Sequence, residues 1–123
     1  MNRRYVAATA LALSLLSTPL PSLAGDGSAL FDQECADCHS VKGKNKKGPT
    51  LAGVIGRKAG TVADFTNYSD AMKAKGIVWS PDKLDAYIKN PRAYVAGGTM
   101  KYDGLADADA RAAIIAYLAA AKG

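Results

Sequence analysis

The chain has 123 residues, a length that fits one small domain, with a formal net charge of +5 and 7% aromatic residues. Its lysines are not interleaved with a row of aromatic side chains, as they are in many proteins that bind single-stranded nucleic acid. The composition therefore argues against nucleic acid as the partner.

Residues 1–24 have the pattern of a cleaved signal peptide. Arg3 and Arg4 precede a short apolar run, and small residues stand before the expected cleavage position. The alternative is a retained membrane anchor, but the apolar run is shorter than the ~20 residues that a spanning helix needs. We therefore predict cleavage after Ala24, export to the periplasm and a mature domain of residues 25–123. Without the two arginines, the mature domain has 14 basic and 11 acidic residues, a net charge of +3.

The first predicted helix begins near Asp26 or Ser28, either of which can cap it. Apolar residues and two cysteines then recur at spacings of three and four, namely Leu30, Phe31, Cys35 and Cys38. We expect this helix to run through both cysteines. Gly27 lies one turn before Phe31, and a glycine inside a helix usually marks the close approach of another element.

The helix leads into the motif Cys35-Ala36-Asp37-Cys38-His39. The spacing C-x-x-C-H is typical of c-type haem attachment, with two thioether bonds and histidine as the proximal iron ligand. A thioredoxin-like pair needs a βαβ context, which the downstream sequence lacks. A structural zinc site needs four ligands, and the chain has two cysteines and one histidine. A structural disulfide between Cys35 and Cys38 stays open, because the chain has an export signal.

Loops separate the remaining predicted elements. Residues 41–49 are rich in lysine and glycine, and residues 50–60 are interrupted by glycines, so we expect irregular chain in both. Short helical character is expected over residues 69–75. No segment alternates long enough to predict a strand, and no internal repeat is visible.

Two later helices have clear signals. Ser80, Pro81 and Asp82 form an N-cap, a first-turn proline and a first-turn acid, and Asn90-Pro91 ends that helix. The last helix covers roughly residues 107–121. Between these two helices, residues 95–104 form a glycine-rich loop around Met100, which we call the Met100 loop.

A methionine thioether is the strongest candidate for the sixth iron position, because the chain has a single histidine. Met1 leaves with the signal peptide, so the choice is Met72 or Met100. Met72 is best interpreted as core filler. Met100 lies in a flexible loop with enough chain on both sides to reach the opposite haem face. We therefore predict His39 and Met100 as the axial ligands.

The mature chain resembles the class I c-type cytochromes, in particular the bacterial soluble type close to mitochondrial cytochrome c. The resemblance covers nearly the whole mature chain and is carried by matches at Gly27, Phe31, residues 35–39, residues 48–49, residues 56–58, residues 68–71, residues 75–79, Tyr87, residues 90–91, Tyr94 and residues 100–104. It implies an all-α, single-haem cytochrome c fold in which the N- and C-terminal helices cross, with one haem c attached covalently per chain.

The resemblance also implies supporting roles around the haem. The Pro49 carbonyl would accept a hydrogen bond from His39, and the Tyr87 hydroxyl would donate to the sulfur of Met100. Donors to a buried propionate would be Arg57, Tyr68 and Trp79. Ordinary core packing is the alternative role for each of these side chains. The family's loop hydroxyl two places before the methionine is replaced by Gly98, and Thr99 is the candidate substitute.

The family's ring of lysines around the haem edge is thinned, since Glu34 stands just before Cys35 where a lysine is common. The expected docking charges are Lys44, Lys46, Lys47, Arg92 and Lys101.

These observations predict a monomeric periplasmic electron carrier rather than an enzyme. Electrons would come from a quinol–cytochrome c reductase and pass to a terminal oxidase or a photosynthetic reaction centre. A haem enzyme or gas sensor with a displaceable sixth ligand is one alternative. A dedicated electron acceptor for a periplasmic dehydrogenase is another alternative. The sequence does not distinguish this acceptor from a carrier between a quinol–cytochrome c reductase and an oxidase or reaction centre.

Overall fold

The computed structural model describes residues 16–18 and 26–122. The predicted cleavage site after Ala24 and most of the predicted signal peptide lie outside the described residues. Within the described ranges, no helix is both long and apolar enough to cross a membrane.

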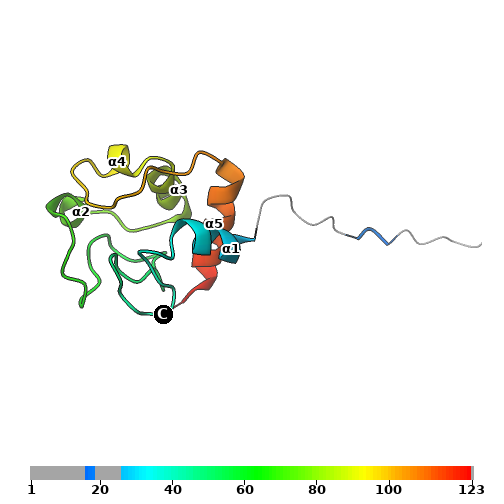
Figure 1. The fold of residues 1–123 in the computed structure, drawn as a ribbon, viewed down its shortest axis with the longest axis horizontal. Coiled ribbons are helices and arrows are strands. Elements are labelled where there is room, and N and C mark those ends of the chain that lie inside the picture. The colour runs from blue at the N-terminus through cyan, green and yellow to red at the C-terminus, as the bar shows by residue number, and fades with distance from the viewer. Residues whose placement is uncertain (1–15, 19–25, 123) are drawn as a thin grey trace, which may run out of the picture.

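The first and last helices, α1 (Gly27–Glu34) and α5 (Ala108–Ala120), lie against each other (Figure 1). Each begins at an aspartate whose carboxylate accepts from backbone N–H groups of the first turn. Asp26 accepts from the N–H of Ser28 at 3.0 Å, and Asp107 accepts from that of Asp109 at 2.9 Å. Both predicted helix starts are therefore confirmed.

The contact between α1 and α5 depends on Gly27. A Cβ added to this residue would lie 2.2 Å from the carbonyl oxygen of Ala113, so only glycine fits there without a shift of backbone. One turn later, the ring centroids of Phe31 and Tyr117 are 5.4 Å apart. The predicted all-α fold with crossing terminal helices is confirmed.

The haem-attachment motif differs from the expectation, because α1 ends at Glu34 and does not run through it. The carbonyl of Phe31 accepts from the N–H groups of both Cys35, at 2.8 Å, and Ala36, at 3.0 Å. The second bond spans five residues instead of four, which widens the last turn and ends the regular helix. The motif then continues as turns, with the N–H of His39 donating to the carbonyl of Cys35 at 2.9 Å.

The short helix α2 (Asp70–Ala74) and helix α3 (Pro81–Lys89) lie where helices were predicted. The hydroxyl of Ser80 caps α3 by accepting from the N–H of Lys83 at 3.3 Å. Asn90-Pro91 ends α3 as predicted, but Pro91 also begins a further helix, α4 (Pro91–Tyr94), which the sequence analysis missed. The physical reason is that proline is favoured at the first helical position, and the Asn90 side chain caps the new helix.

The core joins these helices to irregular chain. Val54 and Ala59, in the predicted irregular stretch, are each 2% exposed and pack in one cluster with Trp79, Leu84 and Ile114. The described residues contain no strand, only an isolated bridge between residues 58 and 78. The predicted irregular chain over residues 50–60 is confirmed. Part of the core is therefore built from loop residues, here Val54 and Ala59, rather than from helices.

Candidate functional site

His39 lies in the loop after α1 with one ring nitrogen fixed and the other free. Its Nδ1 is 2.8 Å from the carbonyl oxygen of Pro49, and because a carbonyl can only accept, Nδ1 carries the proton. Nε2 makes no hydrogen bond with any residue that the structure describes. Burial lowers the pKa of His39; the bond to Pro49 opposes this, and the charges of Arg57 and Lys46 add to it. At neutral pH the ring is therefore neutral, with a lone pair on Nε2 for a metal.

Gly48 allows the backbone to approach this ring. A Cβ added to Gly48 would lie 2.3 Å from Cε1 of His39, so a side chain there would displace the imidazole. The N–H of Gly48 donates to the carbonyl of Cys38 at 2.8 Å, which ties this loop back to the motif. From the sequence, Gly48 was predicted only to lie in an irregular, lysine- and glycine-rich stretch. A glycine followed by the proline that holds the histidine is the signal that could have identified its role.

Cys35 and Cys38 are both half-buried and are not joined in a disulfide. Burial, followed by the negative charges of Glu34 and Cys38, raises the pKa of the Cys35 thiol to about 11. Because the thiolate is the reactive form in thiol–disulfide exchange, these surroundings disfavour a redox-active pair. These half-buried, unpaired thiols thus agree better with covalent attachment than with a thioredoxin-like function.

Met100 is supported by Tyr87, which projects from α3. The hydroxyl of Tyr87 donates to Sδ of Met100 at 3.6 Å. Burial raises the pKa of Tyr87 to about 12, so the hydroxyl stays protonated and can donate. The Tyr87 ring stacks on that of Trp79, with centroids 5.1 Å apart and planes 28° apart, which fixes its position. A thioether sulfur retains a lone pair for a metal after accepting one hydrogen bond.

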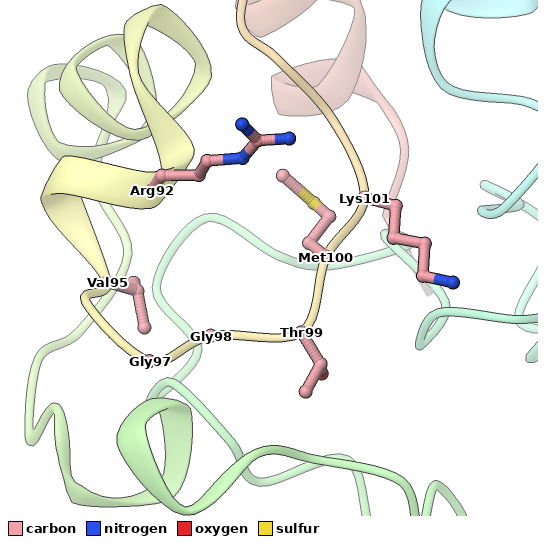
Figure 2. Close-up of a pocket in the computed structure, with 7 residues that line it drawn as sticks. All are labelled: Arg92, Val95, Gly97, Gly98, Thr99, Met100 and Lys101. Carbon is pink, nitrogen blue, oxygen red and sulfur yellow. The ribbon is translucent and has the colours of Figure 1, made fainter.

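A cavity of about 510 Å³ lies beside Met100, between α4 and the Met100 loop (Figure 2). The lining residues are Arg92, Val95, Gly97, Gly98, Thr99, Met100 and Lys101. In Figure 2, Met100 and Arg92 extend toward each other, whereas Thr99 and Lys101 point away from Met100. His39 and the two cysteines do not line this cavity, so it represents the methionine side of the site only.

Met72, the second methionine candidate, packs against the hydrophobic core from the short helix α2. It lines neither the cavity nor the smaller pocket beside Tyr87. This placement is that of a core residue.

The three predicted propionate donors have contacts within the protein. The Arg57 guanidinium donates to the carbonyl oxygens of Thr50 at 2.9 Å and Ala52 at 3.3 Å, and burial lowers its pKa while Tyr68 opposes that shift. The Tyr68 hydroxyl accepts from the N–H of Val62 at 3.1 Å. Trp79 is buried against Tyr87. Their role toward a propionate, like that of Thr99, stays a prediction.

The predicted docking charges differ in their contacts. Lys44, Lys46, Lys47 and Lys101 are exposed, and Nζ of Lys46 also donates to the carbonyl of Ala36 inside the haem-attachment motif. Arg92 is paired with Asp103 at 2.9 Å, and both side chains are exposed. This pair largely cancels the charge that Arg92 was expected to offer to a partner.

One contact near the site was not predicted. The hydroxyl of Tyr102 donates to the carboxylate of Glu34 at 2.7 Å. Burial and this hydrogen bond, together with the charge of Glu34, raise the pKa of Tyr102, so the hydroxyl remains a donor at neutral pH. No sequence signal connects two residues 68 positions apart.

Together these groups fit a covalently attached haem. Two unpaired thiols precede a neutral imidazole with a free Nε2, and a thioether is oriented by a hydroxyl. Nitrogen and thioether sulfur are the axial donors of electron-carrying c-type haems. No cluster of three or more His, Cys, Asp or Glu that could bind a separate metal ion occurs among the described residues.

Comparison with known proteins gives the same result. The cytochrome c family model matches residues 24–122. Cytochrome c2 of Rhodopila globiformis is 47% identical over 98 residues, which cover 79% of this chain and 92% of the relative. Cytochrome c type-1 of Ascaris suum is 47% identical over 93 residues, 75% of this chain and 82% of the relative. A c-type cytochrome of Rhodobacter capsulatus, cyt cy, is also 47% identical, over 75% of this chain but 46% of its own length.

Proposed function

This chain belongs to the cytochrome c family, whose members carry electrons on a covalently bound haem c, and we propose that it is a monomeric, periplasmic, single-haem electron carrier. It accepts electrons from a quinol–cytochrome c reductase. It delivers them to a terminal oxidase or a photosynthetic reaction centre. The predicted signal peptide supports the periplasmic location, since the sequence has a positive start, a short apolar run and small residues before Ala24.

In this proposal Cys35 and Cys38 would hold the haem covalently, and Nε2 of His39 and Sδ of Met100 would bind its iron. When bound, the haem supplies an iron that alternates between the ferrous and ferric states. The observation that carries the assignment is that both candidate ligands are oriented by hydrogen bonds. Pro49 fixes the His39 ring through Nδ1 at 2.8 Å, and Tyr87 holds the Met100 sulfur at 3.6 Å.

The protein side chains then restrict the site to electron transfer. If both His39 and Met100 bind the iron, no coordination position would be left for oxygen, peroxide or carbon monoxide. The half-buried surroundings of both residues limit the access of water. A carrier needs this arrangement, whereas a haem enzyme or gas sensor needs an open or easily vacated sixth position.

The test is isolation of the protein from the periplasm. We expect an N-terminus at Gly25, one haem that survives acid–acetone extraction, and a ferrous absorption spectrum unchanged by carbon monoxide. A spectrum that shifts with carbon monoxide favours a haem enzyme or gas sensor. An intact mass that shows a Cys35–Cys38 disulfide without haem contradicts the whole assignment.

A further inference from the structure

The hydrogen bond between Tyr102 and Glu34 connects the segment after Met100 to the end of α1. The Tyr102 hydroxyl donates to Oε2 of Glu34 at 2.7 Å, and both side chains are half-buried. Glu34 is the last residue of α1 and directly precedes Cys35. The bond therefore joins the segment that contains Met100, one proposed iron ligand, to the segment that contains the haem-attachment cysteines.

The Met100 loop has few other attachments. From Thr99 to Gly104, its backbone makes no backbone–backbone hydrogen bond with any residue in the described part of the chain. One side-chain tie is the ion pair of Arg92 with Asp103, but these side chains are 75% and 88% exposed, and such surface pairs contribute little. The other is the contact of Tyr87 with the Met100 sulfur, at 3.6 Å.

The bond between Tyr102 and Glu34 is the strongest of these side-chain contacts. It is short, and its acceptor is charged, which makes a hydrogen bond roughly twice as strong as one between neutral groups. Partial burial also protects it from screening by salt. It lies two residues from Met100, so an opening of the loop that carries Tyr102 along with Met100 has to strain or break it.

The position of Glu34 supports a specific role. A carboxylate at the C-terminal end of a helix is disfavoured by the helix dipole, and α1 has no basic residue in its last turn to offset this. The hydrogen bond from the Tyr102 hydroxyl offsets this unfavourable position of the Glu34 carboxylate. Neither residue has a role in the proposed electron-carrier mechanism, so that mechanism does not explain this contact.

We propose that Tyr102 and Glu34 are positioning residues that hold the Met100 loop in the ligating position, as a clamp between the two sides of the haem site. The inference rests on the proposed role of Met100 as axial ligand. The clamp lowers the fraction of molecules in which Met100 has left the iron. The apparent affinity of a competing ligand is proportional to this open fraction.

The test uses imidazole as the competing ligand, titrated into the ferric holoprotein and followed by absorbance. Tyr102→Phe retains the ring and removes only the donor, and we expect it to bind imidazole about tenfold more tightly than the parent. Glu34→Ala removes the same bond from the other side and should give a similar increase. The double variant should bind little more tightly than either single one, because both remove one interaction.

Tyr117→Phe is the matched control, because the Tyr117 hydroxyl makes no hydrogen bond with another described residue and its ring packs on Phe31, in the contact between α1 and α5. It should bind imidazole as the parent does. A urea midpoint that falls in Tyr102→Phe and Glu34→Ala, with imidazole affinities within twofold of the parent, would show a merely structural bond and overturn the clamp.

Failure of the ligand assignment itself gives a different result. If Met100 is not the axial ligand, Met100→Ala has the same near-infrared spectrum as the parent before any imidazole is added, and it binds imidazole as the parent does. The clamp is then overturned together with the proposed role of Met100. If the band is present in the parent and lost in Met100→Ala, and only the Tyr102 and Glu34 variants fail to respond, the role of Met100 stands and the clamp alone is wrong.

Discussion

The hydroxyl of Tyr87 and the sulfur of Met100 are 3.6 Å apart, and the Tyr87 ring is held there by its stacking on Trp79. A hydroxyl that donates to a thioether withdraws electron density from the sulfur. If that sulfur binds iron, the weaker donor favours the ferrous state, because ferric iron depends more on electron donation. The side chain is thus placed to tune the iron as well as to hold its ligand.

We predict that Tyr87→Phe lowers the reduction potential by about 20–40 mV, the equivalent of one modest hydrogen bond. The fold should be retained, because the aromatic ring and its stacking are unchanged. The measurement is a redox titration of the purified protein, with Tyr117→Phe as the control. A potential that rises or does not move would show that the hydroxyl does not act through the sulfur.

Met100→Ala should abolish the near-infrared sulfur-to-iron charge-transfer band of the ferric protein. Met72→Ala should leave the band in place, because Met72 packs against the core, and should instead cost about 1–2 kcal/mol of stability through the lost packing. Absorbance at neutral pH and urea unfolding of both variants provide the measurements. The reverse pattern, with the band lost only in Met72→Ala, contradicts the ligand assignment.

Gly27→Ala should destabilise the protein by about 1–2 kcal/mol, although alanine favours helix more than glycine does. The added Cβ would meet the carbonyl oxygen of Ala113 at 2.2 Å, and a backbone atom inside α5 moves only if the two helices separate. Ala29→Gly, at an exposed position of the same helix, is the control. There glycine should be the destabilising residue, through helix propensity alone. Urea midpoints of the parent and both variants compare the two sites, and a Gly27→Ala variant at least as stable as the parent would contradict the close approach.

Much of the fold could be predicted from local signals in the sequence. Asp26 and Ser80 cap their helices as expected, because capping depends only on the next few residues. The prediction that α1 runs through both cysteines was wrong, because the helix ends at Glu34. The hydrogen bond from the N–H of Ala36 to the carbonyl of Phe31, five residues earlier, belongs to the turn of the motif and cannot be predicted from helical periodicity. Helix α4 was missed because Asn90-Pro91 signals both the end of one helix and the start of the next.

The site was less predictable where it depends on residues far apart in sequence. The motif and the scarcity of histidine were enough to select Cys35, Cys38 and His39 as candidates. The cancellation of Arg92 by Asp103 and the bond from Tyr102 to Glu34 depend on how the Met100 loop lies against α4 and α1. Sequence spacing carries no information about such contacts, so charges that looked available for docking proved to have partners within the chain.

The last prediction concerns the association with a redox partner. An electron carrier must dock quickly and leave quickly, and opposite charges raise the encounter rate more than they lengthen the complex lifetime. The structure reduces the predicted docking set, because Arg92 is paired with Asp103. The exposed lysines at positions 44, 46, 47 and 101 remain, with Asp37 exposed within the haem-attachment motif.

We therefore expect modest steering toward an acidic partner. The double variant Lys44→Glu and Lys47→Glu, which leaves the contact of Lys46 with Ala36 in place, should lower the second-order electron-transfer rate at low salt by about three- to tenfold, and Asp37→Lys should raise it. Asp37 is a cleaner target than Glu34, whose reversal would also break the bond to Tyr102. Both effects should shrink as salt shortens the range of charge to ~8 Å at physiological ionic strength, while the reduction potential changes little. Stopped-flow rates that are flat across ionic strength and equal in all variants would instead indicate apolar docking, with the lysines serving only to keep the loop soluble.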